Sequence, residues 1–345
     1  MITLNRNSLK KRLDKSFQKD ISENNIGGCS AIVRQHGEIV YSNNFNSTDK
    51  TLYRLASMTK PITSVAASIL FDRGKLNLED SVAKYIPEFR KGEKIKILHL
   101  LTHTSGIFSE KIRETAKLEK KDKETLSSTV EFYSKLPTAF EPFTKEEYSG
   151  VAAFDVLTYI IEKITDTDYN EFLKKEIFLP LGMINTTFVP STEQWKNIIT
   201  MHDKTESGIG ATTENCVFED YPCTHYLGGA GLISSASDYS KFAEMLLSGG
   251  EGIISPESVK LISTAHVPES IMPGTERWGL GVRVIVKDEY KPLPVGTFGW
   301  SGAYGSHFWV DPANKITAVF MKNSRYDGGA ANRSARQFEN DVYYI

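Results

Sequence analysis

Serines followed three positions later by a lysine are the clearest candidates for chemistry, because a hydroxyl is a weak nucleophile that needs a nearby base. This spacing occurs five times, at Ser8/Lys11, Ser16/Lys19, Ser47/Lys50, Ser57/Lys60 and Ser81/Lys84. Four of the pairs lie among charged or polar residues, where a lysine stays hydrated. Ser57 and Lys60 instead open the long apolar stretch 57–71, which ends before Gly74.

The position of Ser57 and Lys60 favours catalysis on physical grounds. A serine at the start of a helix lies near the positive end of the helix dipole, which stabilises a developing negative charge. Three residues make almost one helical turn, so the two side chains share a face. A lysine against an apolar core loses hydration, which favours the neutral amine and lets it accept the serine proton. The structural alternative is a capping serine beside a lysine whose ammonium reaches water.

Other catalytic patterns are missing. The sequence has no Gly-x-Ser-x-Gly elbow, no phosphate-binding loop of the GxxxxGK type and no HExxH. Cys216, Cys223 and His225 are the nearest approach to a metal cluster, but their spacing matches no common zinc knuckle, so we expect no metal and no other cofactor. The glycine-rich run 228–231 lacks dinucleotide-binding spacing, and with Ser235 it predicts a turn into a helix.

Composition excludes several classes of protein. The 345 residues carry 41 basic and 43 acidic side chains, a net charge of −2, which argues against nucleic-acid binding. Three cysteines argue against a disulfide scaffold. No apolar segment is long enough to span a membrane or to serve as a signal peptide, so we expect a cytoplasmic protein. The oligomeric state does not follow from the sequence.

The elements that must position Ser57 and Lys60 come from both ends of the chain. Apolar residues every four positions predict an N-terminal helix around Leu9 and Phe17, and His36-Gly37 predicts a hairpin turn. Further strands are expected at 279–286, 296–300, 307–310 and 316–321, a last helix at 329–344, and central helices at 128–136, 151–165 and 169–178. The charged segment 110–125 reads as a solvated helix or loop. We therefore expect one α/β layer from residues 1–75 and 228–345, with a mainly helical domain inserted at 76–227.

Six motifs, in order, resemble those of β-lactamase-type serine hydrolases, which include class C β-lactamases, D,D-carboxypeptidases and family VIII carboxylesterases. The first is Ser57-Met-Thr-Lys60. The others are Leu100-Leu-Thr-His-Thr-Ser-Gly106, Tyr148-Ser149-Gly150, Pro180-Leu-Gly-Met183, Gly228-Gly-Ala-Gly-Leu232 and Trp300-Ser301-Gly302. The resemblance spans roughly residues 28–325. It implies an antiparallel sheet flanked by N- and C-terminal helices with the helical insertion.

The resemblance also implies roles for single residues. Ser57 would form the acyl-enzyme, and Lys60 and Tyr148 would be the acid/base pair, in an order that stays open. The backbone N–H groups of Ser57 and Ala303 would form the oxyanion hole. Trp300, Ser301 and Gly302 would lie beside the substrate. His103 is the only histidine inside a motif, and we expect it to be structural. Tyr304 and His307 lie close to Trp300-Ser301-Gly302 and are candidate pocket residues.

Two departures from the family pattern bear on the substrate. Trp300 stands where β-lactamases and D,D-peptidases carry a lysine or histidine, and an indole cannot neutralise a carboxylate. Gly150 stands where the family has an asparagine, so a side-chain amide for substrate amides is missing. Both changes affect recognition of anionic amide substrates and leave Ser57, Lys60 and Tyr148 intact. This pattern looks closest to the family VIII esterases and predicts cleavage of short-chain carboxylic esters.

Two other functions stay open. The same nucleophile could serve a β-lactamase or D,D-carboxypeptidase acting on a β-lactam-like or peptide substrate. The remaining hypothesis is a non-catalytic sensor that recognises penicillins, and the intact nucleophile argues against it. In every case the expected partner is a small molecule.

Overall fold

The sheet that carries the site is antiparallel throughout. The structure is a computed structural model that describes residues 2–108, 116–205, 208–211, 225–289, 292–322, 324–325 and 333–344. Among them, seven strands pair in the order β2–β1–β11–β10–β9–β8–β7. Their bounds are Cys29–Gln35 (β1), Glu38–Phe45 (β2), Glu276–Trp278 (β7), Arg283–Ile285 (β8), Phe298–Ser301 (β9), His307–Asp311 (β10) and Ile316–Lys322 (β11).

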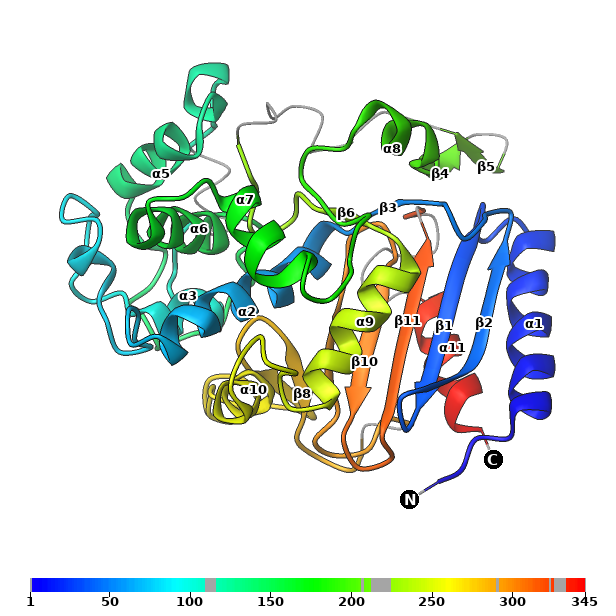
Figure 1. Ribbon diagram of the computed structural model, residues 1–345. Coiled ribbons are helices and arrows are strands. Elements are labelled where there is room, and N and C mark those ends of the chain that lie inside the picture. Colours follow the sequence, from blue (N-terminus) through cyan, green and yellow to red (C-terminus); the bar gives the residue numbers. More distant parts are fainter. Residues whose placement is uncertain are drawn as a thin grey trace.

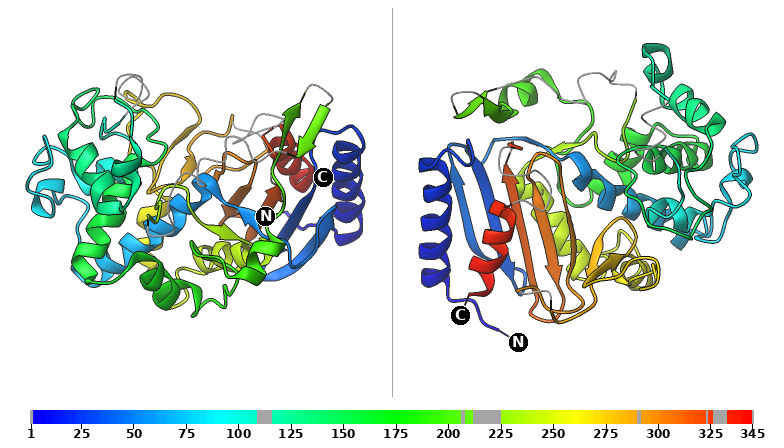
Figure 2. Two further views of the ribbon diagram at one scale, coloured as in Figure 1. Left: turned by 90° about the horizontal axis from the view of Figure 1, so that it is seen from above. Right: turned by 180° about the vertical axis from the view of Figure 1, so that it is seen from behind.

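Helices from the two ends of the chain cover one face of this sheet. Helix α1 (Arg6–Ser22) buries Leu9, Leu13 and Phe17, as the four-residue spacing predicts, and α11 (Arg333–Tyr343) packs beside it. The Phe17 ring lies 5.8 Å from that of Phe338. Helix α9 (Ala236–Leu247) crosses the opposite face (Figure 1). Seen from behind, α1 and α11 lie over one side of the sheet and leave the strands toward β8 uncovered (Figure 2).

Most remaining helices gather at the end of the molecule away from α1 (Figure 1). Helix α2 (Thr59–Asp72) joins them to the sheet, and its first twelve residues are all buried. The others are α3 (Ile97–Leu101), α5 (Leu126–Lys135), α6 (Ala152–Thr165), α7 (Tyr169–Leu173), which continues as a π-helix over Lys174–Phe178, and α10 (Pro256–Ser263). Helix α8 (Thr192–Asn197) lies apart from them, above the sheet in Figure 1. Short strands β3 (Tyr53–Arg54) and β6 (Ile233–Ser234) pair together, as do β4 (His202–Thr205) and β5 (Gly208–Ala211).

The expected fold class is confirmed, with one strand shorter than expected, because only β8 (283–285) lies within the predicted run 279–286. The antiparallel sheet, the flanking terminal helices and the central helices are present. The run 279–286 is not one strand: Gly279 donates its N–H to the carbonyl of Val282, which makes a turn between β7 and β8. Part of the charged segment 110–125 lies outside the described residues. The proposed domain boundaries near residues 75 and 228 stay a prediction.

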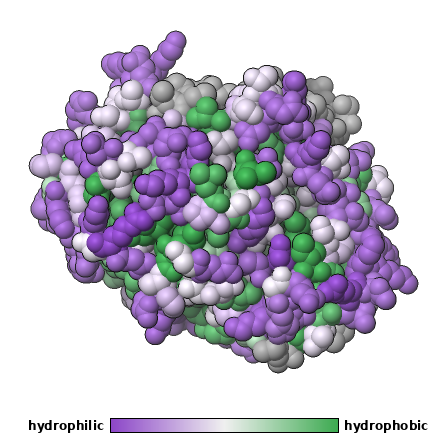
Figure 3. All heavy atoms as spheres, in the orientation of Figure 1, coloured by the Kyte–Doolittle hydropathy of each residue, from purple (hydrophilic) through white to green (hydrophobic). Residues whose placement is uncertain are grey.

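The outer surface fits the near-neutral composition. Figure 3 shows a mainly hydrophilic face on which hydrophobic residues form small, separate patches. In the described part of the chain, no helix is both long and apolar enough to cross a membrane.

Candidate active site

Ser57 lies in a strained turn at the start of α2. The turn is a 3₁₀ helix, Ala56–Met58, that runs directly into Thr59–Asp72, so the expected helix start at Ser57 is correct to within one turn. Ala56 has a φ of 46°, a left-handed conformation that is uncommon for a residue with a side chain. Such strain concentrates at functional sites. Here the strained turn places the half-buried Ser57 at the N-terminal end of α2.

Lys60 is fully buried and held by three acceptors. Its Nζ donates to the carbonyl oxygen of Gly150 at 2.6 Å and to that of Gly229 at 2.8 Å. The third contact, at 3.3 Å, is with Ser57 Oγ. Because an ammonium has three N–H donors, these contacts can satisfy it completely. The lysine is thus fixed in place while it faces the serine.

Tyr148 approaches Ser57 from the other side. Its hydroxyl lies 2.7 Å from Ser57 Oγ, the shorter of the two contacts with the serine. The Tyr148 side chain is 37% exposed, which makes it accessible to a small molecule. The Lys60 Nζ lies 4.9 Å from the centre of the Tyr148 ring, so the two candidate acid/base groups also contact each other. The structure therefore brings together all three residues expected to be catalytic.

The glycine-rich run 228–231 lets the backbone approach Lys60. A Cβ at Gly229 would lie only 3.1 Å from the Gly150 carbonyl and 3.3 Å from Lys60 Nζ. A Cβ at Gly228 would clash with Thr158 Oγ1 at 1.8 Å. The run also leads into α9, which Ser235 caps as expected. Its contact with Lys60 could not be read from the sequence.

His103 positions Tyr148 and carries no charge. It is fully buried, and its ring lies 4.5 Å from that of Tyr148. Its Nδ1 accepts a hydrogen bond from the Ser149 N–H, 3.1 Å away. Burial, aided by the charges of Lys60 and Arg283, lowers the pKa of His103 well below its usual value, so the ring is neutral near pH 7. These contacts agree with the expected structural role.

Aromatic rings form a wall beside Ser57. The half-buried Trp300 ring lies 5.5 Å from that of Tyr148 and 4.7 Å from that of Trp278. Trp278 stacks on Tyr148 at 5.9 Å with an interplanar angle of 15°. A Cβ on Gly150 would meet nothing within 4 Å, so the space that an asparagine would use is open.

Trp278, Arg283 and Glu146 belong to this wall, although the sequence analysis missed them. The Arg283 guanidinium lies 4.1 Å from the Trp278 ring, and Glu146 accepts a hydrogen bond from the Trp278 indole N–H at 2.7 Å. Glu146 thereby ties the segment before Tyr148 to β7. Two glycines close together, at 279 and 281, signalled the turn that places Trp278 and Arg283 on neighbouring strands.

The end of β9 approaches the nucleophile turn through Gly302. A Cβ on Gly302 would lie 2.2 Å from the Leu55 carbonyl, so only glycine allows this contact. Ala303 follows in an exposed position. The Ser301 side chain lies on the other face of the strand from Trp300, as neighbouring strand residues must, and its Oγ bonds to His307 Nδ1 at 2.7 Å. Tyr304 is buried beside Ala56 and Met201.

No cluster of three or more potential metal-ligating side chains occurs in the described residues, and Cys216 and Cys223 lie outside them. His225 is buried; its Nε2 lies 3.8 Å from Asp155 Oδ2, and its Nδ1 lies 3.2 Å from Thr129 Oγ1. Burial raises the pKa of Asp155. This pair is part of the core behind Lys60.

Comparisons with known proteins identify the family. The β-lactamase family model matches residues 13–340. Esterase EstB of Burkholderia gladioli is 30% identical, covering 93% of this chain and 92% of its own length. The structure of EstCE1, "a hydrolase with promiscuous acyltransferase activity", superposes with a TM-score of 0.88 at 25% identity over 98% of this chain and 99% of its own. A penicillin-binding protein homologue from Caulobacter crescentus shares the fold at 16% identity, with a TM-score of 0.82 over 99% and 98% of the two chains. The chain belongs to the β-lactamase family, and it is a serine hydrolase.

Proposed function

We propose that this serine hydrolase is a carboxylesterase that cleaves short-chain esters through an acyl-enzyme on Ser57. The observation that carries the proposal is the contact of Ser57 Oγ with both Tyr148 and Lys60 beside the uncharged Trp300 ring. An ester needs less assistance than an amide because its alcohol leaves more readily. The expected substrate is thus a neutral ester.

The reaction proceeds in two transfers of the acyl group. Ser57 Oγ attacks the ester carbonyl carbon while its proton passes to the phenolate form of Tyr148, which becomes the neutral phenol, and the backbone N–H groups of Ser57 and Ala303 stabilise the oxyanion. Tyr148 then protonates the departing alkoxide, which leaves the acyl group on Ser57. Water attacks the acyl carbon, its proton passes through Tyr148, and Ser57 is restored as the carboxylic acid leaves.

Tyr148 is proposed as the proton carrier because of its contacts. Its oxygen lies 2.7 Å from Ser57 Oγ, within the range for proton transfer, whereas Lys60 Nζ lies 3.3 Å away and is already engaged by two carbonyls. Lys60 then supplies a positive charge that stabilises a phenolate on Tyr148.

A substrate panel tests the proposal. Wild type should hydrolyse p-nitrophenyl butyrate much faster than nitrocefin, and a fluorophosphonate should leave an adduct on Ser57 by mass spectrometry. Ser57→Ala should lose ester hydrolysis and should form no fluorophosphonate adduct. Full ester turnover by Ser57→Ala would refute the proposed nucleophile, faster nitrocefin turnover would favour the β-lactamase or peptidase, and stoichiometric acylation without turnover would favour the sensor.

Acyl transfer to alcohols is a second candidate, supported by the rings of Trp278, Trp300 and Tyr148. Tyr148 and Trp300 are partly exposed and offer an apolar surface to an organic alcohol beside the acyl group, whereas water gains nothing from it; the buried Trp278 supports their rings from behind. EstCE1 is described as having acyltransferase activity. With vinyl butyrate and benzyl alcohol in water, benzyl butyrate should form alongside butyric acid. Formation of the acid alone would exclude this activity.

A further inference from the structure

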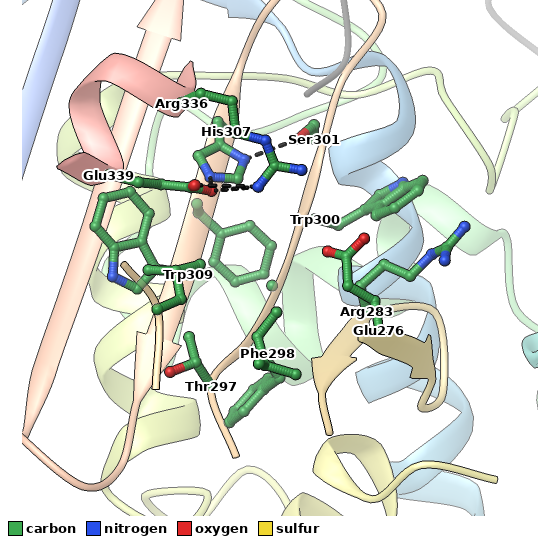
Figure 4. A pocket seen from close by; sticks show the side chains of 14 residues that line it. Glu276, Arg283, Thr297, Phe298, Trp300, Ser301, His307, Trp309, Arg336 and Glu339 are labelled. Carbon is green, nitrogen blue, oxygen red and sulfur yellow. Dashed lines mark hydrogen bonds and ion pairs between the residues drawn. The ribbon is translucent and has the colours of Figure 1, made fainter. Parts of the chain in front are cut away.

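A further pocket adjoins the aromatic wall, and Trp300, Ser301 and Arg283 are among the residues that line it. It is a cavity of about 160 Å³ over β8, β9 and β10, on the side that carries α11 (Figure 4). Ile285, Leu293 and Trp309 give it apolar walls, and all three are buried. None of the residues proposed as catalytic lines it.

The pocket exists because no large side chain fills this part of the sheet. Thr297 directly precedes β9, and Gly299 and Ser301 lie within it. Because the three residues occupy every second position, they share one face of the strand. Gly299 has no side chain, and a Cβ there would lie 2.1 Å from the carbonyl of Phe308 on the neighbouring strand. The close approach of the two strands thus keeps the floor of the pocket open.

The charged groups at one end of the pocket are already paired. Figure 4 shows His307 between Ser301 and Glu339, with Arg336 on the same carboxylate. His307 Nε2 lies 2.9 Å from Glu339 Oε1, and Arg336 Nη1 lies 3.0 Å from Glu339 Oε2. A charged ligand would find its counter-charge already occupied at this end. Glu276 and Arg283 also line the pocket, and their opposite charges attract each other, so the lining as a whole favours an uncharged molecule.

Three residues that line the pocket, Thr297, Arg283 and Trp300, have a buried polar atom for which no hydrogen-bond partner occurs among the described residues, and Thr297 is the only hydroxyl among the three. Thr297 is 1% exposed, and no hydrogen-bond partner for its hydroxyl occurs among the residues that the structure describes. A buried hydroxyl without a partner is destabilising, which is why such groups are rare and point to an unseen partner. Thr297 lines the pocket, so a molecule inside could supply the missing hydrogen bond.

We propose that this pocket binds an uncharged, single-ring compound with one hydroxyl group, which hydrogen-bonds to Thr297. A protein cavity of about 150 Å³ accommodates benzene, so the volume suits one ring. The apolar walls supply the burial, and the hydroxyl of the ligand can both donate and accept. Because Trp300 lines the pocket and its ring contacts Tyr148, the bound compound would lie directly against the active-site wall.

The test compares phenol with benzene, which lacks the hydroxyl. Binding is measured by calorimetry on Ser57→Ala, so the result does not depend on the proposed acyl chemistry. Ser57→Ala, in which the pocket is unchanged, should bind phenol saturably and at least about tenfold more tightly than it binds benzene. This ratio corresponds to one hydrogen bond of about 1.4 kcal/mol. Thr297→Val should remove that preference and retain benzene binding, and Leu293→Trp should abolish the binding of both.

Thr167→Val, an exposed threonine far along the chain, is the matched control and should change nothing. Melting temperatures verify that each variant is folded. Absence of saturable phenol binding, or phenol binding that survives Leu293→Trp, would overturn the site. An unchanged preference for phenol in Thr297→Val would overturn the role of the hydroxyl.

Discussion

Removing the Tyr148 hydroxyl tests the reaction scheme most directly. Tyr148→Phe deletes the oxygen 2.7 Å from Ser57 Oγ and keeps the ring that packs on His103, Trp278 and Trp300. The backbone at Gly150 and the contacts of Lys60 should therefore be unchanged. The substitution isolates proton transfer from the architecture of the site.

The expected loss follows from the role. General acid–base catalysis contributes roughly 10²–10⁴-fold, so kcat for p-nitrophenyl butyrate should fall by that factor, or about 3–5 kcal/mol of transition-state stabilisation. Stability should change little, because the hydroxyl belongs to a partly exposed side chain and a typical hydrogen bond contributes about 0.5–1.5 kcal/mol. A large fall in rate with a small fall in stability is the signature of proton transfer.

The assay pairs steady-state kinetics with the rate of fluorophosphonate labelling, which reports attack by Ser57. Tyr344→Phe is the matched control, because Tyr344 is 70% exposed and directly follows the last residue of α11. Both variants should melt within a few degrees of wild type. If Tyr148→Phe keeps kcat within threefold of wild type, Tyr148 is not the proton carrier and the scheme fails.

Three further predictions concern the surroundings of the nucleophile. Gly229→Ala places a Cβ 3.1 Å from the Gly150 carbonyl and 3.3 Å from Lys60 Nζ, so kcat should fall about tenfold as that contact shifts; an unchanged kcat would contradict the required close approach. Burial lowers the pKa of His103, so below about pH 6.5 the unfolded chain binds a proton at this residue that the folded protein does not. The free energy of unfolding should therefore drop by up to about 1.4 kcal/mol per pH unit below that point. His103→Asn should flatten this slope when urea titrations at pH 7.5 and 5.5 are compared. Equal pH slopes in the wild type and in His103→Asn would disprove this contribution of His103 to stability. Trp300→Lys should shift the ratio of nitrocefin to ester specificity by about tenfold toward the carboxylate-bearing β-lactam, and a constant ratio would show that residue 300 does not face the acyl group.

Local spacing predicted the parts of the site that depend on neighbouring residues. Ser57 and Lys60 lie one turn apart, so an apolar helix was enough to pair them. Tyr148 came only from its motif, because no local rule connects it with a serine 91 positions away. The terminal helices and most strands were likewise readable from periodicity.

Long-range contacts explain what the sequence analysis missed. Trp278 and Arg283 reach the aromatic wall only because a turn separates two strands where one run was expected. The carbonyls of Gly150 and Gly229 have no sequence signal at all, since every residue carries a carbonyl. For Ser301 a signal did exist: strand alternation predicts that it faces away from its neighbour Trp300.

The anchoring of Lys60 has a consequence for how activity arises during folding. Its two carbonyl partners lie 90 and 169 positions away in the chain, so the lysine joins three distant segments. Contacts with such separation form late, because the intervening loops must close first. Helix α2 can therefore form while its lysine is still unanchored. Recovery of hydrolysis after dilution from denaturant should lag behind recovery of helical circular dichroism, which makes catalysis a reporter of completed topology.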